Sequence, residues 1–392
     1  MIMASMNFAL LAKQYKKELF DSIIPFWLKH SLDRKFGGYL HCLDRDGTPF
    51  SDEKMMWMEC REVWMFSHLY RTVSQEKEWL DAAKLGADFL RKKGCNNKCE
   101  WYFLIARDGT PLIAPYNIFS DVFAVMAFTE YGAITGGKWA TQLAQKTFRR
   151  IQQRLSNPKG KYNKKLSASK SLVEHALPMM NLYIAGILRD LAPLPECDEI
   201  IENSLDTVMR TLFDKKTMLV YEYANPDGTH PDSPEGRLIN PGHIIESMWF
   251  MMEELKRRND KKQIELASKV MLNALEFGWD KEHSGIYAFL DAKGYSPTPL
   301  EWHMKLWWAH CEALYGCLLV YELTRNEKFL EWFKKVHDYT WAHFPDHEYG
   351  EWFGYLDRQG NVTHRYKGSR WKSFFHVPRA LLYCWKKLEK LA

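Results

Sequence analysis

The segment LVYEYANPDG (residues 219–228) is followed by LINPGHIIESMWFMMEELKRR (238–258), and this succession decides the fold. In the first segment apolar residues lead into a turn ending in Asp-Gly, which predicts a short strand or hairpin. The second segment is apolar almost all round a helix, which is typical of a buried helix. A hairpin leading into a buried helix is therefore the unit to look for elsewhere.

This unit recurs along the chain. Similar strand-and-turn motifs occur at GGYLHCLDRDG (37–47), EWYFLIARDG (100–109), SGIYAFLDAKG (284–294) and GEWFGYLDRQG (350–360). The glycines that end the five motifs are 62, 119, 66 and 66 residues apart. Because 119 is nearly two periods, we expect a degenerate sixth copy near NPKGKY (157–162).

A strongly apolar helical segment follows each copy, and amphipathic helices lie between these segments and the next copy. The apolar segments are residues 54–71, 117–134, 171–191, 238–258, 301–323 and 371–391, and clear amphipathic ones are 77–94, 261–279 and 326–344. Helices that are apolar all round belong inside, and one-faced helices belong outside. The sequence thus predicts an all-α (α/α)6 barrel over residues 1–392, a single domain with short β-hairpins at one end.

Composition limits the class of partner. The net charge of +5 is dispersed without long basic runs, so nucleic acid is not expected. The N-terminus lacks a signal-peptide core, and the longest apolar stretch (176–188) is interrupted and too short to span a bilayer. Cys95 and Cys99 form the only close cysteine pair, so we expect no metal site and reduced thiols in a cytoplasmic protein.

His243 is the first candidate for chemistry. Asn240 is a suitable N-cap and Pro241 suits the first helical position, which places His243 in the first turn, three residues before Glu246. The positive end of the helix dipole favours a neutral imidazole there, as a general base requires. The alternative is a core histidine satisfied by Glu246.

Polar residues are few in the other inner helices. Pro378 must lie near the start of its helix, which places His376 at a helix mouth as well. Two imidazoles facing across one cavity suit two-base chemistry, in which one removes a proton from carbon and the other returns one to the opposite face. The remaining candidates are Trp57, Arg61, Asn117, Asp121, Trp249, Lys305, Trp308, Glu312 and Arg379.

Several of these candidates have competing interpretations. Arg61 would stabilise an enolate, or would form a buried ion pair with a glutamate. Glu246 and Glu312 would orient the imidazoles or bind sugar hydroxyls. His175 would line the pocket or serve only as a core histidine, and it stays outside the catalytic set.

Over nearly its whole length the chain resembles the N-acylglucosamine 2-epimerases, or renin-binding proteins. The resemblance is carried by seven motifs: PYNIFSD (115–121), NPKGKY (157–162), EGRLINPGHIIESMWF (235–250), KLWWAHCEAL (305–314), HDYTW (337–341), EYGEWFGYLDRQG (348–360) and FHVPRALLYCW (375–385). It implies reversible interconversion of N-acetylglucosamine and N-acetylmannosamine.

The resemblance also implies residue roles. His243 and His376 match the two catalytic histidines, Arg61 and Glu312 match essential pocket residues, and Glu246, Trp249 and Trp308 match sugar-contacting positions. It further implies a homodimer and ATP as an activator that is not consumed. The segment implicated in the nucleotide effect holds Lys159, Lys161 and Lys164.

Four other functions stay open at this point. Two use the same barrel, namely cellobiose 2-epimerase and mannose (aldose–ketose) isomerase. Glycoside hydrolysis would use Glu246 and Glu312 as its two carboxylates and would leave the paired histidines unexplained. The last is a non-enzymatic, renin-binding type of protein with a large exposed apolar patch.

Overall fold

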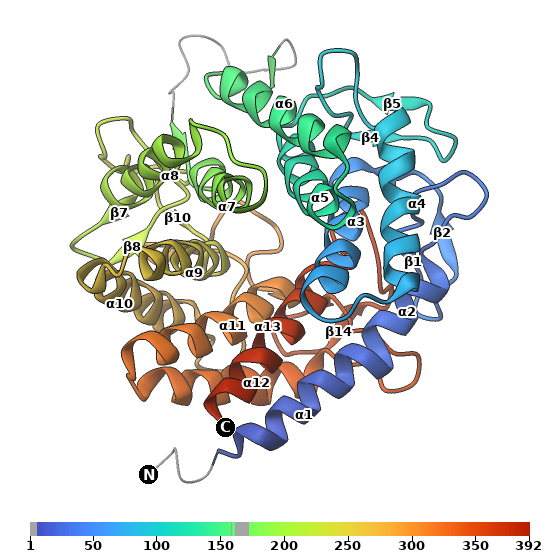
Figure 1. The fold of residues 1–392 in the computed structure, drawn as a ribbon. Helices are drawn as coiled ribbons and strands as arrows, with labels where there is room; N and C mark the ends of the chain where they lie inside the picture. Colours follow the sequence, from blue (N-terminus) through green and yellow to red (C-terminus); the bar gives the residue numbers. More distant parts are fainter. Residues whose placement is uncertain (1–5, 158, 161–171) are drawn as a thin grey trace.

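A computed structural model describes residues 6–157, 159–160 and 172–392. Within these residues the helices close into a ring (Figure 1). The inner helices are α3 (Met56–Thr72), α5 (Phe119–Thr135), α7 (Ala176–Leu191), α9 (Pro241–Arg257), α11 (Trp307–Thr324) and α13 (His376–Leu391). The outer layer consists of α1 (Phe8–Glu18), η2 (Leu19–Ile23), α2 (Ile24–His30), α4 (Lys77–Lys93), α6 (Lys138–Arg154), α8 (Cys197–Asp206), η4 (Thr207–Leu212), α10 (Lys261–Gly278) and α12 (Lys328–His343). The predicted (α/α)6 barrel is confirmed.

The two layers differ in burial as their sequences predict. Almost every residue of α5 and α11 is buried, because one side of each helix packs on outer helices and the other faces the barrel interior. In α4 and α6 the buried residues lie along one face and the charged residues along the other. The ring closes where α1, at the start of the chain, packs on α13 at its end (Figure 1).

The strands are short and antiparallel. They are β1 (Cys42–Leu43), β2 (Pro49–Ser51), β3 (Lys54–Met55), β4 (Leu104–Ile105), β5 (Pro111–Ile113), β6 (Val173–Glu174), β7 (Phe213–Asp214), β8 (Leu219–Val220), β9 (Tyr223–Ala224), β10 (Leu238–Ile239), β11 (Leu290–Asp291), β12 (Lys305–Leu306), β13 (Tyr355–Leu356) and β14 (Val362–His364). The glycines that end the five motifs have φ between +83° and +93°, a region that favours glycine.

Strand pairing links one repeat to another. Three motifs form local hairpins, namely β1–β2, β4–β5 and β13–β14. The other two do not: β9 pairs with β6 and β11 pairs with β10, each from the preceding part of the chain. The strand before an inner helix also pairs with the next motif, as β3 does with β4 and β12 with β13. The strands therefore fix the N-termini of four inner helices, α3, α7, α9 and α11, beside a neighbouring motif.

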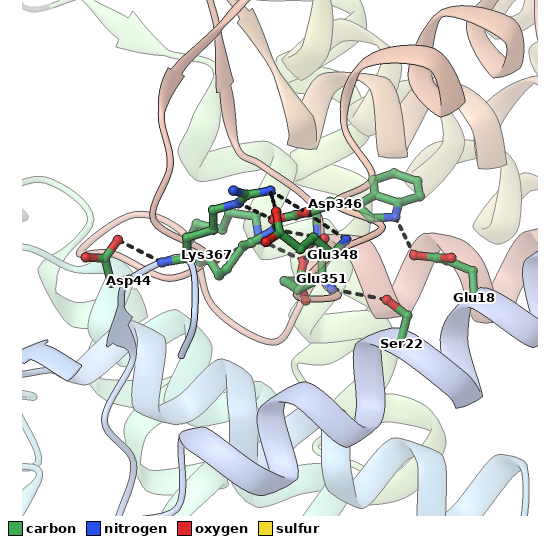
Figure 2. A network of polar contacts seen from close by, with 10 residues as sticks. Glu18, Ser22, Asp44, Asp346, Glu348, Glu351 and Lys367 are labelled. Carbon is green, nitrogen blue, oxygen red and sulfur yellow. Dashed lines mark hydrogen bonds and ion pairs between the residues drawn. The ribbon is translucent and has the colours of Figure 1, made fainter. Parts of the chain in front are cut away.

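A buried ion-pair network ties the last motif to the first (Figure 2). Asp346 accepts a hydrogen bond from Arg45 Nε at 2.7 Å and lies 2.8 Å from Lys367 Nζ. Two further networks repeat this pattern of an aspartate, a buried lysine and an arginine from another motif: Asp33–Lys54–Arg107 and Asp280–Lys305–Arg358. These bonds help to close the hairpin end of the barrel.

None of the helices within the described ranges is both long and apolar enough to cross a membrane.

Candidate active site

The first turn of α9 is built as its sequence predicts. The side chain of Asn240 accepts a hydrogen bond from the backbone N–H of His243 at 3.1 Å, and Pro241 is the first helical residue. Gly242 allows a close approach: a Cβ built there would lie 2.5 Å from the indole of Trp308. This turn therefore presents His243 beside Trp308, with 5.3 Å between their ring centroids.

The partner of His243 is Glu222, between β8 and β9, and not Glu246. Both carboxylate oxygens of Glu222 lie 3.0 Å from Nδ1 of His243. Burial acts to raise the pKa of Glu222, but His243 and His175 lower it to about 2, so the carboxylate is ionised and accepts. Nδ1 of His243 is therefore the donor, and Nε2 is left as its other nitrogen.

The helix dipole favours a neutral imidazole but does not decide the charge of His243. The expectation that the dipole keeps His243 neutral is therefore wrong. Burial lowers the pKa of His243, but the nearby carboxylate of Glu222 outweighs it and raises the pKa above its usual value. A full negative charge in contact with the ring outweighs the partial charge of a helix terminus.

His376 is the first residue of α13, and its partner is Glu312 of α11. Nδ1 of His376 lies 2.7 Å from Oε1 of Glu312. Trp249 and Arg379 also donate to Glu312, at 2.9 and 2.7 Å, and Arg379 donates to Glu246 at 2.8 Å. Burial, Arg61 and Arg379 hold the pKa of His376 well below its usual value. The imidazole of His376 is therefore neutral at neutral pH.

Trp308 lies close to both histidines. Its ring centroid is 5.3 Å from that of His243 and 6.1 Å from that of His376. Since these rings come from the first turns of α9, α11 and α13, three inner helices converge on one place. The two predicted bases therefore both lie beside Trp308, and their sharing of one substrate pocket stays a prediction.

Arg61 of α3 projects toward the same place but has no bonded carboxylate within the described part of the chain. Its guanidinium carbon lies 4.1 Å from the ring centroid of Phe123 and 5.0 Å from that of Phe375. The ring centroid of Trp57, one turn earlier in α3, lies 5.4 Å from the same guanidinium carbon. Burial lowers the pKa of Arg61 to about 9 although Glu246 acts to raise it. The ion-pair interpretation does not hold, and this cation remains available to a ligand.

Comparison with known proteins connects this geometry to a family. The sequence model of N-acylglucosamine 2-epimerase (GlcNAc 2-epimerase) matches residues 38–380. The N-acylglucosamine 2-epimerase of Mus musculus is 36% identical over 387 residues, which cover 95% of this chain and 90% of the mouse protein. The chain belongs to the N-acylglucosamine 2-epimerase family. It is therefore an epimerase, an enzyme of the isomerase class.

Solved structures show the same barrel. Cellobiose 2-epimerase from Bacillus thermoamylovorans B4167 superposes with a TM-score of 0.82 at 23% identity, covering 97% of this chain and all of that one. A D-mannose isomerase gives a TM-score of 0.82 at 18% identity, with 95% and 97% covered. At this identity the likeness establishes the fold of the epimerase.

The structure gives other partners to three residues predicted to bind substrate. Asp121 accepts from Arg154 Nη1 at 3.0 Å, and Asn117 accepts from the backbone N–H of Phe119 at 2.6 Å. Lys305 lies in β12 rather than in the inner helix predicted over residues 301–323, so its predicted place in that helix is wrong. It is buried against Asp280 at 3.0 Å, which makes it part of the hairpin network.

The other predicted binding residues lie near the histidines. Trp249, Glu246 and Arg379 form one buried hydrogen-bonded group with Glu312, so they act on His376 through that carboxylate. Trp57 donates through Nε1 to the carbonyl of Arg370 at 3.1 Å, and its ring meets Trp371 edge-on at 5.1 Å. Trp57 and Trp371 therefore form an aromatic pair beside Arg61.

Two trios of side chains have donor atoms close enough to be considered for a metal ion: His175, Glu222 and His243, and Glu246, Glu312 and His376. Arg379 already bridges the two carboxylates of the second trio. In the first, Glu222 faces imidazole nitrogens that donate to it. Hydrogen bonds thus account for both trios among the described residues, and the expectation of a metal-independent site stays a prediction.

Of the lysines predicted to respond to nucleotide, Lys159 is exposed, and Lys161 and Lys164 lie outside the described residues. The degenerate sixth copy expected near residues 157–162 lies partly outside the described residues and stays a prediction, although the N–H of Gly160 donates to the carbonyl of Asn157 at 3.0 Å.

Sequence reasoning missed Glu222. Its signal was present: six residues before the closing glycine, where this motif has glutamate, the other copies carry His41, Phe103, Ala288 and Gly354. A lone carboxylate in an otherwise apolar strand motif requires a partner.

Proposed function

We propose that this epimerase interconverts N-acetylglucosamine and N-acetylmannosamine by inverting C2 of the ring-opened sugar. The observation that carries the proposal is the pair His243 and His376, both beside Trp308 and each with Nδ1 held by a buried carboxylate. This arrangement leaves the Nε2 atom of each ring to exchange a proton with substrate. The family and the 36% identity to the mouse enzyme support the choice of amino sugar.

The reaction needs one base, one acid and a fixed positive charge. One neutral imidazole takes the C2 proton, and the electrons of the C–H bond move into a C1–C2 enolate with the negative charge on the C1 oxygen. Arg61, which lacks a bonded carboxylate among the described residues, would stabilise that oxygen. The second imidazole, protonated, returns a proton to the opposite face of C2. Each positioned acid or base contributes about 10² to 10⁴ in rate.

The test is turnover in D₂O. Incubation of N-acetylmannosamine should yield N-acetylglucosamine carrying deuterium at C2, and the variants His243→Ala and His376→Ala should lose at least about 10²-fold in kcat. Wild-type turnover in both variants would contradict the two-base scheme.

The same assay with mannose and cellobiose separates the alternatives on this barrel. Formation of a ketose would indicate an aldose–ketose isomerase, and epimerisation of cellobiose alone would indicate a cellobiose 2-epimerase. Glycoside hydrolysis is disfavoured because Arg379 donates to both Glu246 and Glu312, so neither is a free general acid. A non-enzymatic renin-binding type of protein would turn over none of these sugars.

ATP activation without consumption is a further proposal and rests on the family resemblance. The exposed Lys159 and its neighbours Lys161 and Lys164 are the proposed effector residues. Turnover with and without ATP, repeated for Lys159→Ala and Lys161→Ala, tests it. A homodimer is proposed on the same grounds and would be checked by sedimentation. A cytoplasmic location is proposed from the scattered cysteines and would be checked by fractionation.

A further inference from the structure

We propose that Glu222, held in place by His175, is the positioning residue that makes His243 the proton donor of the resting enzyme. The proposal rests on the proposed two-base epimerisation and deepens it. Glu222 does not touch substrate in this scheme and acts through the imidazole.

Glu222 is fixed from both its backbone and its side chain. Its N–H donates to the carbonyl of Leu238, just before α9, and its carbonyl accepts from the N–H of His175, each at 3.0 Å. Its side chain is 9% exposed. A carboxylate anchored in this way between two inner-helix N-termini has little freedom to leave His243.

His175 completes a relay behind the carboxylate. Its Nδ1 lies 3.3 Å from Glu222 Oε1 and its Nε2 lies 3.0 Å from Ser247 Oγ, on the helix that carries His243. The ring is fully buried, and burial keeps the pKa of His175 below its usual value. With Glu222 ionised, the one N–H of a neutral His175 donates to Glu222, and its Nε2 faces the Ser247 hydroxyl, which also contacts the carbonyl of Ile244 at 3.2 Å. The negative charge of Glu222 is thus left to His243.

The pair His243–Glu222 and the pair His376–Glu312 lie in different charge environments. The titratable groups that face His243 are Glu222, Glu246, His175 and His376. Among the described residues the carboxylate of Glu222 is bonded to imidazoles only, whereas Glu312, the carboxylate of His376, shares its charge with Arg379. Arg61 also acts on His376. A proton shared between the two bases thus resides on His243, and His376 starts as the base.

The decisive variant is Glu222→Gln, which keeps the shape of the side chain and removes its charge. The pKa of His243 is measured by NMR titration of protein with isotope-labelled histidine. The His243 signal is identified by its loss in His243→Asn. In Glu222→Gln this signal should titrate at lower pH than in the wild type. Glu254→Gln, at the other end of α9 and paired with Arg189 and Arg258, is the matched control and should leave that titration unchanged. An unchanged His243 titration in Glu222→Gln would overturn the proposal.

Kinetics supply a second readout that a purely structural role would not move. In Glu222→Gln, kcat should fall about 10²-fold, and the alkaline limb of kcat/KM should move to lower pH while the acid limb stays. In D₂O the epimer whose C2 proton faces His376 should still exchange that proton, so exchange into recovered substrate should exceed epimerisation. Equal loss of exchange and epimerisation for both epimers would contradict the proposal.

Two further variants keep the proposal falsifiable if Glu222→Gln does not fold. Glu222→Asp retains the charge and should keep the alkaline limb near the wild-type position although kcat falls. His175→Phe removes both relay bonds and should lower the pH at which His243 titrates; no change would overturn the role of His175. The titrations need no substrate, so a wild type without turnover would refute the proposed function alone.

Discussion

Oε1 of Glu312 receives hydrogen bonds from both His376 and Arg379, at 2.7 Å each. One oxygen therefore orients the imidazole of His376 and also binds the cation that disfavours its protonation. Because Glu312 is 2% exposed, water does not screen this arrangement. The structure accordingly makes His376 a neutral base with a fixed direction.

Glu312→Gln should lower kcat by about 10²-fold with a smaller change in KM, because the amide orients His376 less strongly and leaves Arg379 with Glu246 alone. Steady-state kinetics on folded protein will measure this. Glu322→Gln, which removes a carboxylate paired with Lys387 and Lys390, is the matched control and should leave kcat unchanged. Equal losses in the two variants would assign Glu312 a structural role only.

Gly242→Ala should damage both stability and activity. The added methyl would lie 2.5 Å from the indole of Trp308, and overpacking of this kind costs about 1–3 kcal/mol. Displacement of the indole would also disturb the packing of Trp308 against both histidines. Gly186→Ala in α7 is the control, because a Cβ there meets nothing within 4 Å. We expect that variant to be as stable as the wild type or more so, by thermal denaturation.

Lys305→Met separates a structural lysine from a substrate-binding one. The lysine is buried against Asp280, and burial lowers its pKa to about 8. We expect a lower melting temperature with an unchanged KM, because Asp280 keeps only Arg358 as an ion-pair partner. A raised KM at unchanged stability would instead restore Lys305 to the sugar site.

The pH profile of kcat/KM should be a broad bell that spans the usual histidine pKa. Activity requires neutral His376, whose pKa is lowered, so the acid limb should lie well below pH 6.5. It also requires protonated His243, whose pKa is raised, so the alkaline limb should lie above pH 6.5. A single narrow optimum centred on 6.5 would show that the two histidines are equivalent.

Acid should weaken the hairpin end of the barrel. Burial raises the pKa of Asp33, but Arg107 and Lys54 outweigh it and lower the pKa to about 2 from 3.8. The ionised carboxylate thus contributes stability that is present above pH 3.8 and is lost as the pH falls through about 2. Denaturant titrations from pH 6 to 2 should show a steeper loss for the wild type than for Asp33→Asn, which is already destabilised at pH 6.

Glu246 shows where prediction from sequence stopped. Its spacing of three residues from His243 indicates one helical face and suggests that Glu246 is the hydrogen-bond partner of that histidine. The structure turns it to Arg379, 133 residues away, and gives His243 a partner from the strand motif 21 residues before it. Helical spacing indicates which side chains share a face, but it does not identify the groups packed against that face.

The sequence by itself determined the ring of helices and the place of each histidine. Apolar periodicity, the Asn240–Pro241 start of α9 and Pro378 near the start of α13 are local features, and helix boundaries depend mainly on local interactions. Only the tertiary structure decided the pairing of Glu222 with His243, the pairing of Glu312 with His376, and the removal of Lys305 from the site. Those pairings join different strands and helices of the fold. Each pairing contributes strongly because a buried charge without a partner is costly. The partner is therefore whichever group the tertiary structure places next to that charge.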